Sequence, residues 1–468
     1  MRWIIATAVF GLCGCAITGG PPVDAPPLRD EGELHVYLAP FPHQSGRLTF
    51  VIRELAAVGE SGESVPLQLD LGVIAASGQV RDERVLANGR LPRGRYTGLR
   101  LAVASARLAG DEGASDLLVA TEPAWIEVPF DVRRGQALVV ALSFDPVRSV
   151  EVGFGFTPRF SGSVPARATP GLVGACSSTR GNQLLLFDRQ TRTVGGVVAT
   201  GRSPYGVALD PVANRAWVAL GGQDQIDVVD LARGESVSRV QMRGGDEPRA
   251  LLLLADRRTL LVVNFRSQTA SFVDAVTMQE LTRVPVGEGP WSVVQQRGGN
   301  RAFVVNRRSS SLTVIDLATR QAIGTVATDP EPLFAQVSRD GGHLYVVHAG
   351  SLFMTEYALP SMAVTQRIRV GLGVSAVKLD SRTDLIYVAH AQETRIEVYD
   401  PRSALPVDGF ELPGWVSQMA IDDAQNQLFA VMPSRRAVAV VDLTSRKVLS
   451  EIEPPGEPYE VRLSAERN

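Results

Sequence analysis

Residues 290–331 read PWSVVQQRGGNRAFVVNRRSSSLTVIDLATRQAIGTVATDPE. The segment holds four short apolar or alternating runs, at 292–294, 301–306, 311–316 and 322–326, and turn residues separate them. No run shows helical spacing over the length of a helix. Four short strands in ~40–45 residues are typical of one blade of a β-propeller.

Similar segments recur along the chain at a nearly fixed period. They open at seven equivalent positions: Pro204, Pro248, Pro290, Pro332, Val374, Val416 and Pro458. The steps between these positions are 44, 42, 42, 42, 42 and 42 residues, which indicates a propeller or a solenoid. Six units are complete, residues 171–203 lack a first strand, and Pro458–Leu463 supplies one. We therefore predict a seven-bladed ring whose two end fragments share one blade, which leaves no open sheet edge.

An aspartate closes the third strand of nearly every unit. It recurs as Asp188, Asp230, Asp274, Asp316, Asp400 and Asp442, and only Ala358 breaks the series. Six equivalent positions spread around a disc cannot converge on one substrate. We expect these carboxylates to accept backbone N–H bonds and so to start the following turn.

The second strands resemble those of the YVTN-type β-propeller family, named for a Tyr-Val-x-Asn strand. The matching stretches are Phe303–Asn306, Tyr345–His348, Tyr387–His390 and, more loosely, Leu261–Asn264. The family's following Val-Ile-Asp is similar to Val314–Asp316. The resemblance covers about residues 171–468 and implies a propeller fold. It also implies a surface, binding or scaffolding role, without naming a partner.

The first residues predict export and membrane anchoring. A positive Arg2 precedes an apolar run, Trp3–Leu12, which is too short to remain as a membrane-spanning helix and is typical of a signal peptide. The end of this run resembles the bacterial lipoprotein box, in which Cys15 would be lipidated and become the new N-terminus. Ala16 rather than Asp follows, which by the family's rule favours the outer membrane. Cleavage without lipidation is the alternative.

Four further segments divide the chain. We expect a signal peptide over 1–14, a Pro-rich tether over 15–32, a sandwich domain over 33–160 and a linker over 161–170. Seven strands are predicted in the sandwich: Leu34–Leu38, Leu48–Leu55, Pro66–Leu71, Tyr96–Leu108, Trp125–Phe130, Ala137–Phe144 and Val150–Phe156.

These strands and the repeats make the predicted fold class all-β. Seven strands at this spacing indicate an antiparallel β-sandwich placed before the propeller. The Pro-x-Gly-x-Tyr stretch that ends at Tyr96 resembles the strand entry of bacterial surface sandwich domains, and 130–144 resembles the later strands of an uncharacterised lipoprotein family.

Composition and missing motifs narrow the function. Hydrophobic residues make up 45% and charged residues 21% of the chain, and the net charge of −3 argues against a nucleic-acid partner. Cys176 is the only cysteine beyond the signal region, so we expect a buried, inert thiol and no intramolecular disulfide. No nucleophile elbow, zinc-protease motif, phosphate loop or haem-attachment motif occurs. We therefore expect no cofactor, and a monomer that contacts the membrane only through its lipid anchor.

A metal site is one alternative. His348 and His390 occupy the same slot of successive blades, at the end of the second strand, and Met432 fills that slot in the next. In the following blade Cys176 lies near the slot, although counting back from the strand-closing Asp puts Ser178 there. Soft ligands of this kind suit copper. Against this, equivalent positions on neighbouring blades lie far apart for one ion, and each His could serve a loop backbone instead.

The interpretation we favour is a binding site on one face of the propeller. Tyr205, Arg249, Trp291 and Tyr459 directly follow blade-opening positions on four consecutive blades, and Trp415 joins the same rim from a loop. Tyr, Trp and Arg dominate the hot spots of protein interfaces. We therefore expect a non-catalytic module of the cell envelope that holds a protein or a polysaccharide there. The alternatives are packing between blades, a copper-binding or redox-associated propeller, and a lactonase-like hydrolase.

Overall fold

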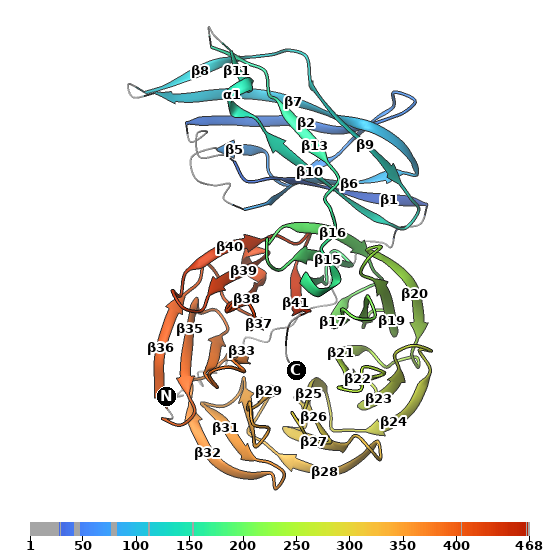
Figure 1. Ribbon diagram of the computed structural model, residues 1–468, viewed down its shortest axis with the longest axis vertical. Helices are drawn as coiled ribbons and strands as arrows, with labels where there is room; N and C mark the ends of the chain where they lie inside the picture. Colours follow the sequence, from blue (N-terminus) through green and yellow to red (C-terminus); the bar gives the residue numbers. More distant parts are fainter. Residues whose placement is uncertain are drawn as a thin grey trace, which may run out of the picture.

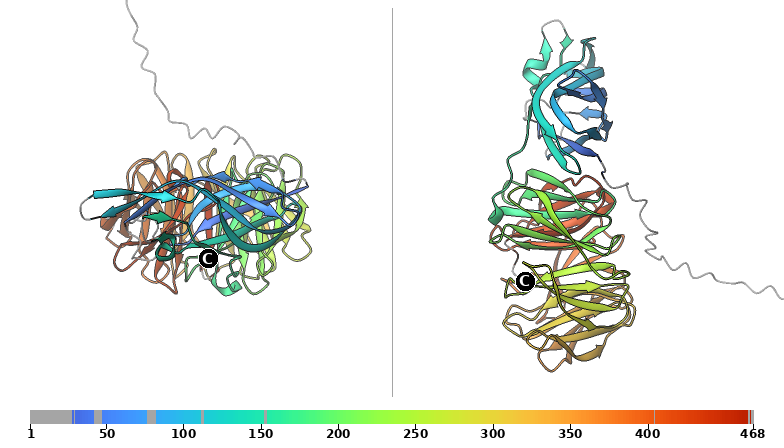
Figure 2. Two further views of the ribbon diagram at one scale, coloured as in Figure 1. Left: turned by 90° about the horizontal axis from the view of Figure 1, so that it is seen from above. Right: turned by 90° about the vertical axis from the view of Figure 1, so that its right-hand side faces the viewer.

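The computed structural model describes residues 28, 30–41, 47–75, 82–110, 113–151, 154–403, 405–464 and 466. It consists of a β-propeller ring and a β-sandwich that stands on the outer rim of that ring (Figure 1). Seen from the side, the sandwich continues the plane of the disc (Figure 2). Both flat faces of the propeller therefore stay clear of the sandwich. The predicted signal peptide and the lipidation of Cys15 lie outside the described residues.

Seven four-stranded sheets form the ring, as the repeat predicts. We number the blades from the one that contains β14. The innermost strands of blades 1 to 7 are β41 (Pro458–Leu463), β17 (Pro204–Asp210), β21 (Pro248–Leu253), β25 (Pro290–Gln295), β29 (Pro332–Val337), β33 (Val374–Leu379) and β37 (Gln418–Asp422). The second strands are β14 (Val173–Ser178), β18 (Arg215–Leu220), β22 (Thr259–Asn264), β26 (Arg301–Asn306), β30 (His343–His348), β34 (Ile386–His390) and β38 (Gln427–Met432).

The outer half of each blade follows the same order. The third strands are β15 (Gln183–Asp188), β19 (Gln225–Asp230), β23 (Thr269–Asp274), β27 (Ser311–Asp316), β31 (Phe353–Ala358), β35 (Arg395–Asp400) and β39 (Ala437–Asp442). The fourth strands are β16 (Val194–Ala199), β20 (Glu235–Gln241), β24 (Glu280–Pro285), β28 (Gln321–Ala327), β32 (Ala363–Arg369), β36 (Leu405–Glu411) and β40 (Val448–Ile452). The middle strands are apolar on both faces because each blade packs between two others; five of the six residues of β26 are buried, whereas β28 is largely exposed.

The ring closes as the sequence predicts. β41 pairs antiparallel with β14, and this register sets Gly174 opposite Leu463 and Cys176 opposite Val461. The last described strand of the chain therefore completes the first blade. Val461 and Leu463 are both buried.

The repeated aspartates act locally, as expected. In each of the six turns an Oδ1 atom accepts one or two backbone N–H bonds; Asp274 Oδ1, for example, accepts from Val276 N at 2.9 Å and Thr277 N at 2.8 Å. The equivalent bonds of the other turns involve Asp188, Asp230, Asp316, Asp400 and Asp442.

The sandwich is built from two sheets. One has the order β13-β10-β1-β6-β4; the other runs β11-β12-β8-β7-β2-β3, with β5 beside β2 and β9 beside β7. Their strands are β1 (Glu31–Leu38), β2 (Leu48–Gly59), β3 (Ser64–Pro66), β4 (Gln68–Leu69), β5 (Val73–Ala75), β6 (Arg84–Pro92), β7 (Gly94–Gly110), β8 (Gly113–Val119), β9 (Ala124–Val132), β10 (Ala137–Phe144), β11 (Val150–Glu151), β12 (Gly155–Phe156) and β13 (Phe160–Ser163). Strict alternation in β9 buries every second residue between the sheets.

Several details differ from the strands expected here. β6 and β8 were not expected, because Asn88-Gly89 interrupts the apolar run of one, and the other begins with Gly, Ala, Ser and Asp before its short apolar end. The span 150–156 holds two very short strands rather than one. β13 pairs with β10, so the sheet extends three residues into the predicted linker. β1 and β10 pair in parallel within an otherwise mostly antiparallel sandwich.

The remaining elements are short. α1 (Pro146–Ser149) is capped by Asp145, and two single 3-10 turns, η2 (Pro170–Leu172) and η3 (Pro433–Arg435), lie beside the blades. Among the described residues, no helix has the length and apolar character needed to cross a bilayer.

The two domains share an apolar junction. Tyr37, Val85 and Val139, on the outer face of the five-stranded sheet, pack in one cluster with Phe187 and Val194 of blade 1. Hydrogen bonds surround this cluster: Gln183 Nε2 donates to Glu33 Oε2 at 2.7 Å, and Val194 N donates to Glu83 Oε2 at 2.7 Å. The sandwich is therefore docked on the rim by buried side chains and not only by the linker.

Candidate functional site

The centre of the ring holds a cavity of about 1460 Å³. The residues that follow the seven blade-opening positions all line it: Tyr205, Arg249, Trp291, Leu333, Ser375, Ser417 and Tyr459. Trp415 lines it as well. The blade repeat places one such residue per blade, because each innermost strand begins at the same end of the channel.

Four aromatic rings surround one guanidinium on one side of this cavity. The Arg249 Cζ atom lies 3.5 Å from the centroid of the Trp291 ring, 4.8 Å from Tyr205, 5.3 Å from Phe265 and 5.6 Å from Tyr459. We call these five residues the aromatic cage. A cation over the face of an aromatic ring within about 6 Å is attracted by the ring quadrupole. The cage therefore fixes the position of Arg249.

The rings also support one another. Tyr205 and Tyr459 have centroids 5.0 Å apart, and Phe265 meets Trp291 edge-on at 6.1 Å. Blades 1 to 4 thus supply the cage: Tyr459, Tyr205, Arg249 with Phe265, and Trp291. Phe265 was missed because it follows the second strand; its signal is an aromatic residue directly after Asn264 of the slot.

Arg249 lacks a carboxylate partner among the described residues. Its Nε atom is buried without a hydrogen-bond acceptor. The acids around the cavity have partners of their own: Glu457 pairs with Arg180 at 2.7 Å, Glu331 with Arg307 at 3.0 Å, and Glu247 with Arg266 at 3.7 Å. Burial raises the pKa of Tyr459, and the Arg249 charge acts against that rise, so the phenol stays protonated at neutral pH.

The deeper part of the cavity is charged and internally paired. Arg462 Nε lies 2.6 Å from Glu460 Oε1 and its Nη1 lies 3.6 Å from Glu466 Oε2, while Lys378 forms an ion pair with Glu466. Burial raises the pKa of Glu466, but Lys378 and Arg462 bring it below its ordinary value. The Glu466 carboxylate is therefore neutralised by Lys378 and Arg462.

The other predicted site residues do not belong to the aromatic cage. Trp415 lines the cavity but makes no ring contact with the cage. His348 and His390 are buried, and each contacts a backbone carbonyl: His348 Nδ1 lies 3.1 Å from Phe353 O, and His390 Nε2 lies 2.8 Å from Val370 O. Burial lowers the pKa of His348.

The slot residue of blade 1 is Ser178 rather than Cys176, since Ser178 faces Gln183 as Leu220 faces Gln225. Within the described part of the chain, no group of three or more His, Cys, Asp or Glu side chains could hold a metal ion. Met432, His348 and His390 are each buried in a different blade.

Comparison with known proteins supports the fold. The YNCE-like beta-propeller family matches residues 180–337. The chain carries a β-propeller of the repeat type. No curated protein sequence matches the chain.

Solved structures add distant neighbours. A functionally unknown protein from Desulfotomaculum acetoxidans has a TM-score of 0.54 at 11% identity, over 62% of this chain and 98% of its own. Hydrazine synthase of Kuenenia stuttgartiensis gives 0.46 at 19% identity, over 51% and 76% of the two chains. The dihydro-heme d1 dehydrogenase NirN gives 0.49 at 15% identity, over 63% and 67%. At these identities the likeness concerns the fold alone.

Proposed function

We propose that this protein is a binding module of the cell envelope whose aromatic cage holds an acidic segment of a protein partner. The observation that carries the proposal is the Arg249 guanidinium, which is stacked 3.5 Å from Trp291 and has no carboxylate partner among the described residues. A guanidinium held in this way offers N–H donors in a fixed plane, which suits bidentate binding of a carboxylate.

The surroundings of Arg249 favour a macromolecular partner. Aromatic residues and arginine provide most of the energy at protein interfaces, where they cluster and are ringed by weaker contacts. Here the cage is bordered by Arg308, whose Cζ lies 4.7 Å from the Phe265 ring, and by the paired Arg307 and Glu331. This arrangement supports a charged rim around an aromatic centre.

The position of the sandwich agrees with this role. It stands on the rim of the disc and covers neither flat face of the propeller (Figures 1 and 2). If Cys15 is lipidated, the tether and sandwich would hold the propeller away from the outer membrane and keep the cage accessible.

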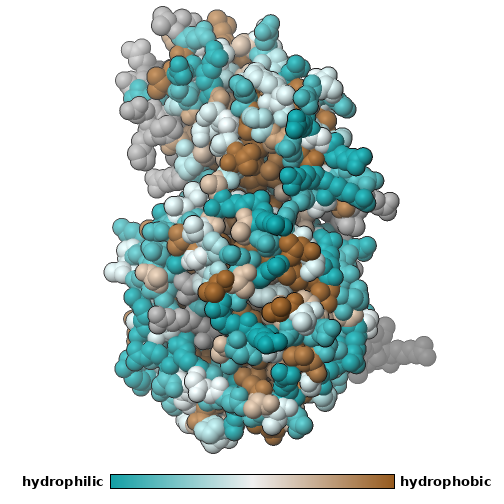
Figure 3. Space-filling view, turned by 45° about the vertical axis from the view of Figure 1, so that its right-hand side comes forward, coloured by the Kyte–Doolittle hydropathy of each residue, from teal (hydrophilic) through white to brown (hydrophobic). Residues whose placement is uncertain are grey.

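The surface shown in Figure 3 carries hydrophobic side chains in small groups among hydrophilic ones, with a larger group on the sandwich near the junction. We expect the contact to depend on a few anchor residues, because the cage consists of four aromatic rings around one guanidinium.

The test compares capture from envelope fractions by the full chain and by three variants. Arg249→Ala and Trp291→Ala should each weaken binding of the captured partner by about 30-fold or more, since a hot-spot truncation costs at least about 2 kcal/mol. Trp125→Ala, on an exposed tryptophan of the sandwich, is the matched control and should bind like wild type. Melting curves confirm that each variant is folded.

Binding is then measured on the purified partner. A captured protein whose binding depends on both cage residues and on its own acidic side chains supports the proposal. Capture of an acidic polysaccharide with the same dependence would replace the protein by a glycan as the occupant. Equal binding by wild type and both cage variants would rule out the cage as the site.

A further inference from the structure

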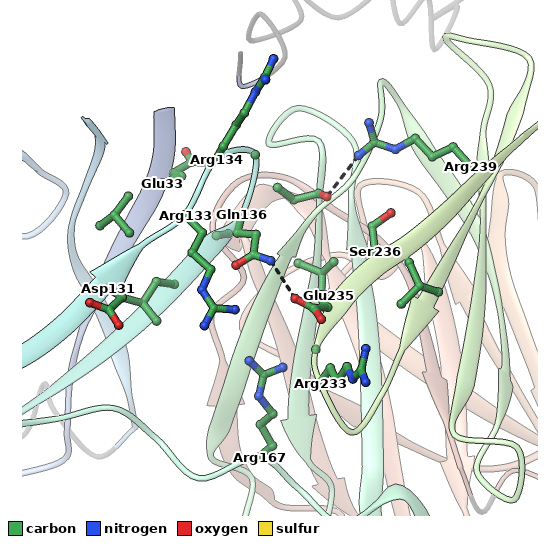
Figure 4. Close-up of a pocket in the computed structure, with 18 of the residues that line it drawn as sticks. Glu33, Asp131, Arg133, Arg134, Gln136, Arg167, Arg233, Glu235, Ser236 and Arg239 are labelled. Atoms are coloured by element: carbon green, nitrogen blue, oxygen red, sulfur yellow. Dashed lines mark hydrogen bonds between the residues drawn. The ribbon is translucent and has the colours of Figure 1, made fainter. Parts of the chain in front are cut away.

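A second cavity lies between the two domains, away from the channel. It has a volume of about 980 Å³ and is open to solvent. Its walls come from the β9–β10 turn of the sandwich, the linker after β13 and the β19–β20 turn of blade 2 (Figure 4). Neither domain forms this cleft alone.

Three arginines from these three segments converge in the cleft. The guanidinium groups of Arg133 and Arg167 lie on one side of the Glu235 carboxylate and that of Arg233 lies on the other, whereas Arg134 points away (Figure 4). Glu235 is already engaged, because Gln136 Nε2 of the sandwich donates to its Oε2 at 2.7 Å. Two other carboxylates line the cleft, but they have partners of their own: Glu33 accepts from Gln183 Nε2 at 2.7 Å, and Asp131 pairs with Arg95 at 3.6 Å.

Among the described residues these three arginines form no ion pair, which sets them apart from their neighbours. Arg239 in the same cleft pairs with Asp227 at 3.3 Å, Arg134 pairs with Asp30 at 3.2 Å, and Arg84 at the junction pairs with Glu453 at 2.8 Å. Like charges held close together repel unless a counter-charge lies between them. The cleft thus has an excess of positive charge that the protein itself does not neutralise.

The backbone fixes Arg167 in this position. Gly234 lies in the left-handed region, with φ of 59°, and a Cβ atom there would come 1.5 Å from Arg167 Nη1. The guanidinium therefore rests directly on the β19–β20 turn. Burial lowers the pKa of Arg167, although Glu235 and Asp230 act in the opposite direction, so this charge is partly removed from water.

We propose that the cleft binds a phosphate group, either free or as a phosphate ester, which Arg133, Arg167 and Arg233 hold between the two domains. Phosphate offers several charged oxygens to several guanidinium groups at once, and arginine matches it in planar, bidentate geometry. The volume of the cleft admits a phosphorylated sugar or headgroup as well as the free ion. The proposal does not depend on the aromatic cage.

The bound anion would also tie the sandwich to the propeller. Arg133 belongs to the sandwich, Arg233 to blade 2, and Arg167 to the chain that joins them. A ligand that contacts all three stabilises the docked arrangement, because binding to the docked form alone adds to its stability.

The test is isothermal titration calorimetry of the full chain with inorganic phosphate at low ionic strength. Arg133→Ala and Arg167→Ala should each weaken binding about tenfold, as expected for loss of one charge-assisted contact. Glu235→Gln should strengthen it, because it removes a negative charge that lies among the three arginines and keeps a side chain that can bond Gln136. Arg107→Ala, an exposed arginine far along the sandwich sheet, should bind like wild type. The opposite signs expected for Arg167→Ala and Glu235→Gln separate a loss of charge from a loss of folding.

A flotation assay distinguishes the source of the phosphate. Phosphatidylcholine vesicles with and without phosphatidic acid are mixed with the protein and its Arg167→Ala variant. Binding to the phosphatidic acid vesicles that depends on Arg167 assigns a lipid headgroup, and Arg167-dependent heat with inorganic phosphate but no flotation assigns a soluble phosphate. Absence of binding in both assays, or binding that neither Arg133→Ala nor Arg167→Ala weakens, overturns the proposal.

Discussion

Arg84 of the sandwich donates from Nε to Glu453 Oε2 of the propeller at 2.8 Å. The same carboxylate oxygen accepts from Val85 N at 3.1 Å, and the backbone carbonyl of Glu453 accepts from the Tyr37 hydroxyl at 2.9 Å. One residue between β40 and β41 thus satisfies three donors from β1 and β6. Since the side chain of Glu453 is 11% exposed, water does not replace these bonds easily.

Glu453→Ala should loosen the docking of the two domains. It leaves Val85 N and Arg84 without their acceptor, which costs about 1–3 kcal/mol for a buried donor. We expect a lower melting temperature and faster proteolysis in the linker around residues 164–169. Glu411→Ala, on an exposed pair with Arg395, is the control and should change stability by less than about 1 kcal/mol. Equal protease sensitivity of Glu453→Ala and wild type would mean that the apolar junction alone holds the domains.

Removal of residues 458–468 should destabilise the whole ring. It deletes β41, exposes the edge of β14 and removes the buried Val461 and Leu463. Each large apolar side chain lost from a core costs about 2–5 kcal/mol, so we expect the truncated protein to lose more than about 5 kcal/mol in denaturant unfolding. Val461→Ala should show a smaller loss of the same sign. A truncated protein that unfolds like the full chain would contradict closure through β41.

The blades and the cage were largely predictable from the sequence. The period of 42 residues places equivalent residues at the same level along the axis of the propeller. Arg249 and Trp291 are one repeat apart, so they are predicted to be neighbours on adjacent blades at the channel. Most of the prediction rests on short strands joined by local turns, and each Asp at the end of a strand indicates the turn that follows it. Phe265 was not predicted, because it lies one residue beyond a strand, where the repeat does not determine the direction of its side chain.

The phosphate cleft could not be predicted in the same way. Arg133, Arg167 and Arg233 lie 34 and 66 residues apart, on three segments with no shared repeat. These arginines lie close together only because the sandwich docks on blade 1 through Tyr37 and its neighbours. This docking is a tertiary contact, and no local sequence pattern indicates it. The same holds for β13, whose Ser and Gly residues do not show that it pairs with β10.

Asp274, one of the strand-closing aspartates, should make the propeller sensitive to acid. Backbone N–H bonds from Thr277 and Val276 lower the pKa of Asp274 to about 2. The ionised form is therefore favoured in the folded state, and its contribution is complete above the ordinary Asp pKa near 4 and is lost as the pH falls toward about 2. We expect Asp274→Ala to lower the melting temperature at neutral pH and the difference from wild type to shrink between about pH 4 and pH 2. A difference that does not change with pH would show that the carboxylate charge plays no part.

Cys176 should be unreactive in the native protein. It is fully buried on β14, and burial raises the pKa of its thiol well above the ordinary range, so almost no thiolate forms at neutral pH. An alkylating reagent followed by peptide mapping should label this cysteine only after denaturation. Rapid labelling in the folded state would indicate that blade 1 opens locally, and labelling of Cys176→Ser serves as the background.

His348 stands where two other blades have asparagine, and the side-chain bond that those asparagines make has no counterpart at His348. In those blades the slot residue bonds a side chain on the third strand: Asn264 Nδ2 donates to Ser271 Oγ at 2.9 Å, and Asn306 Nδ2 to Thr313 Oγ1 at 2.9 Å. The equivalent Thr355 Oγ1 is buried beside His348 without a partner.

His348→Asn should therefore preserve the propeller or stabilise it. The new amide can donate to Thr355 Oγ1, which gains about 1 kcal/mol for one hydrogen bond, while the contact of His348 Nδ1 with Phe353 O is lost. We expect a free energy of unfolding equal to or up to about 1 kcal/mol above that of wild type, measured in denaturant. His348→Asn/Thr355→Val removes both partners and tests whether the gain comes from this bond. Copper content after reconstitution is measured on the same proteins: stoichiometric copper in wild type that His348→Asn abolishes would support the metal alternative, whereas a destabilisation of several kcal/mol without copper would mean that the imidazole itself is required to pack this slot.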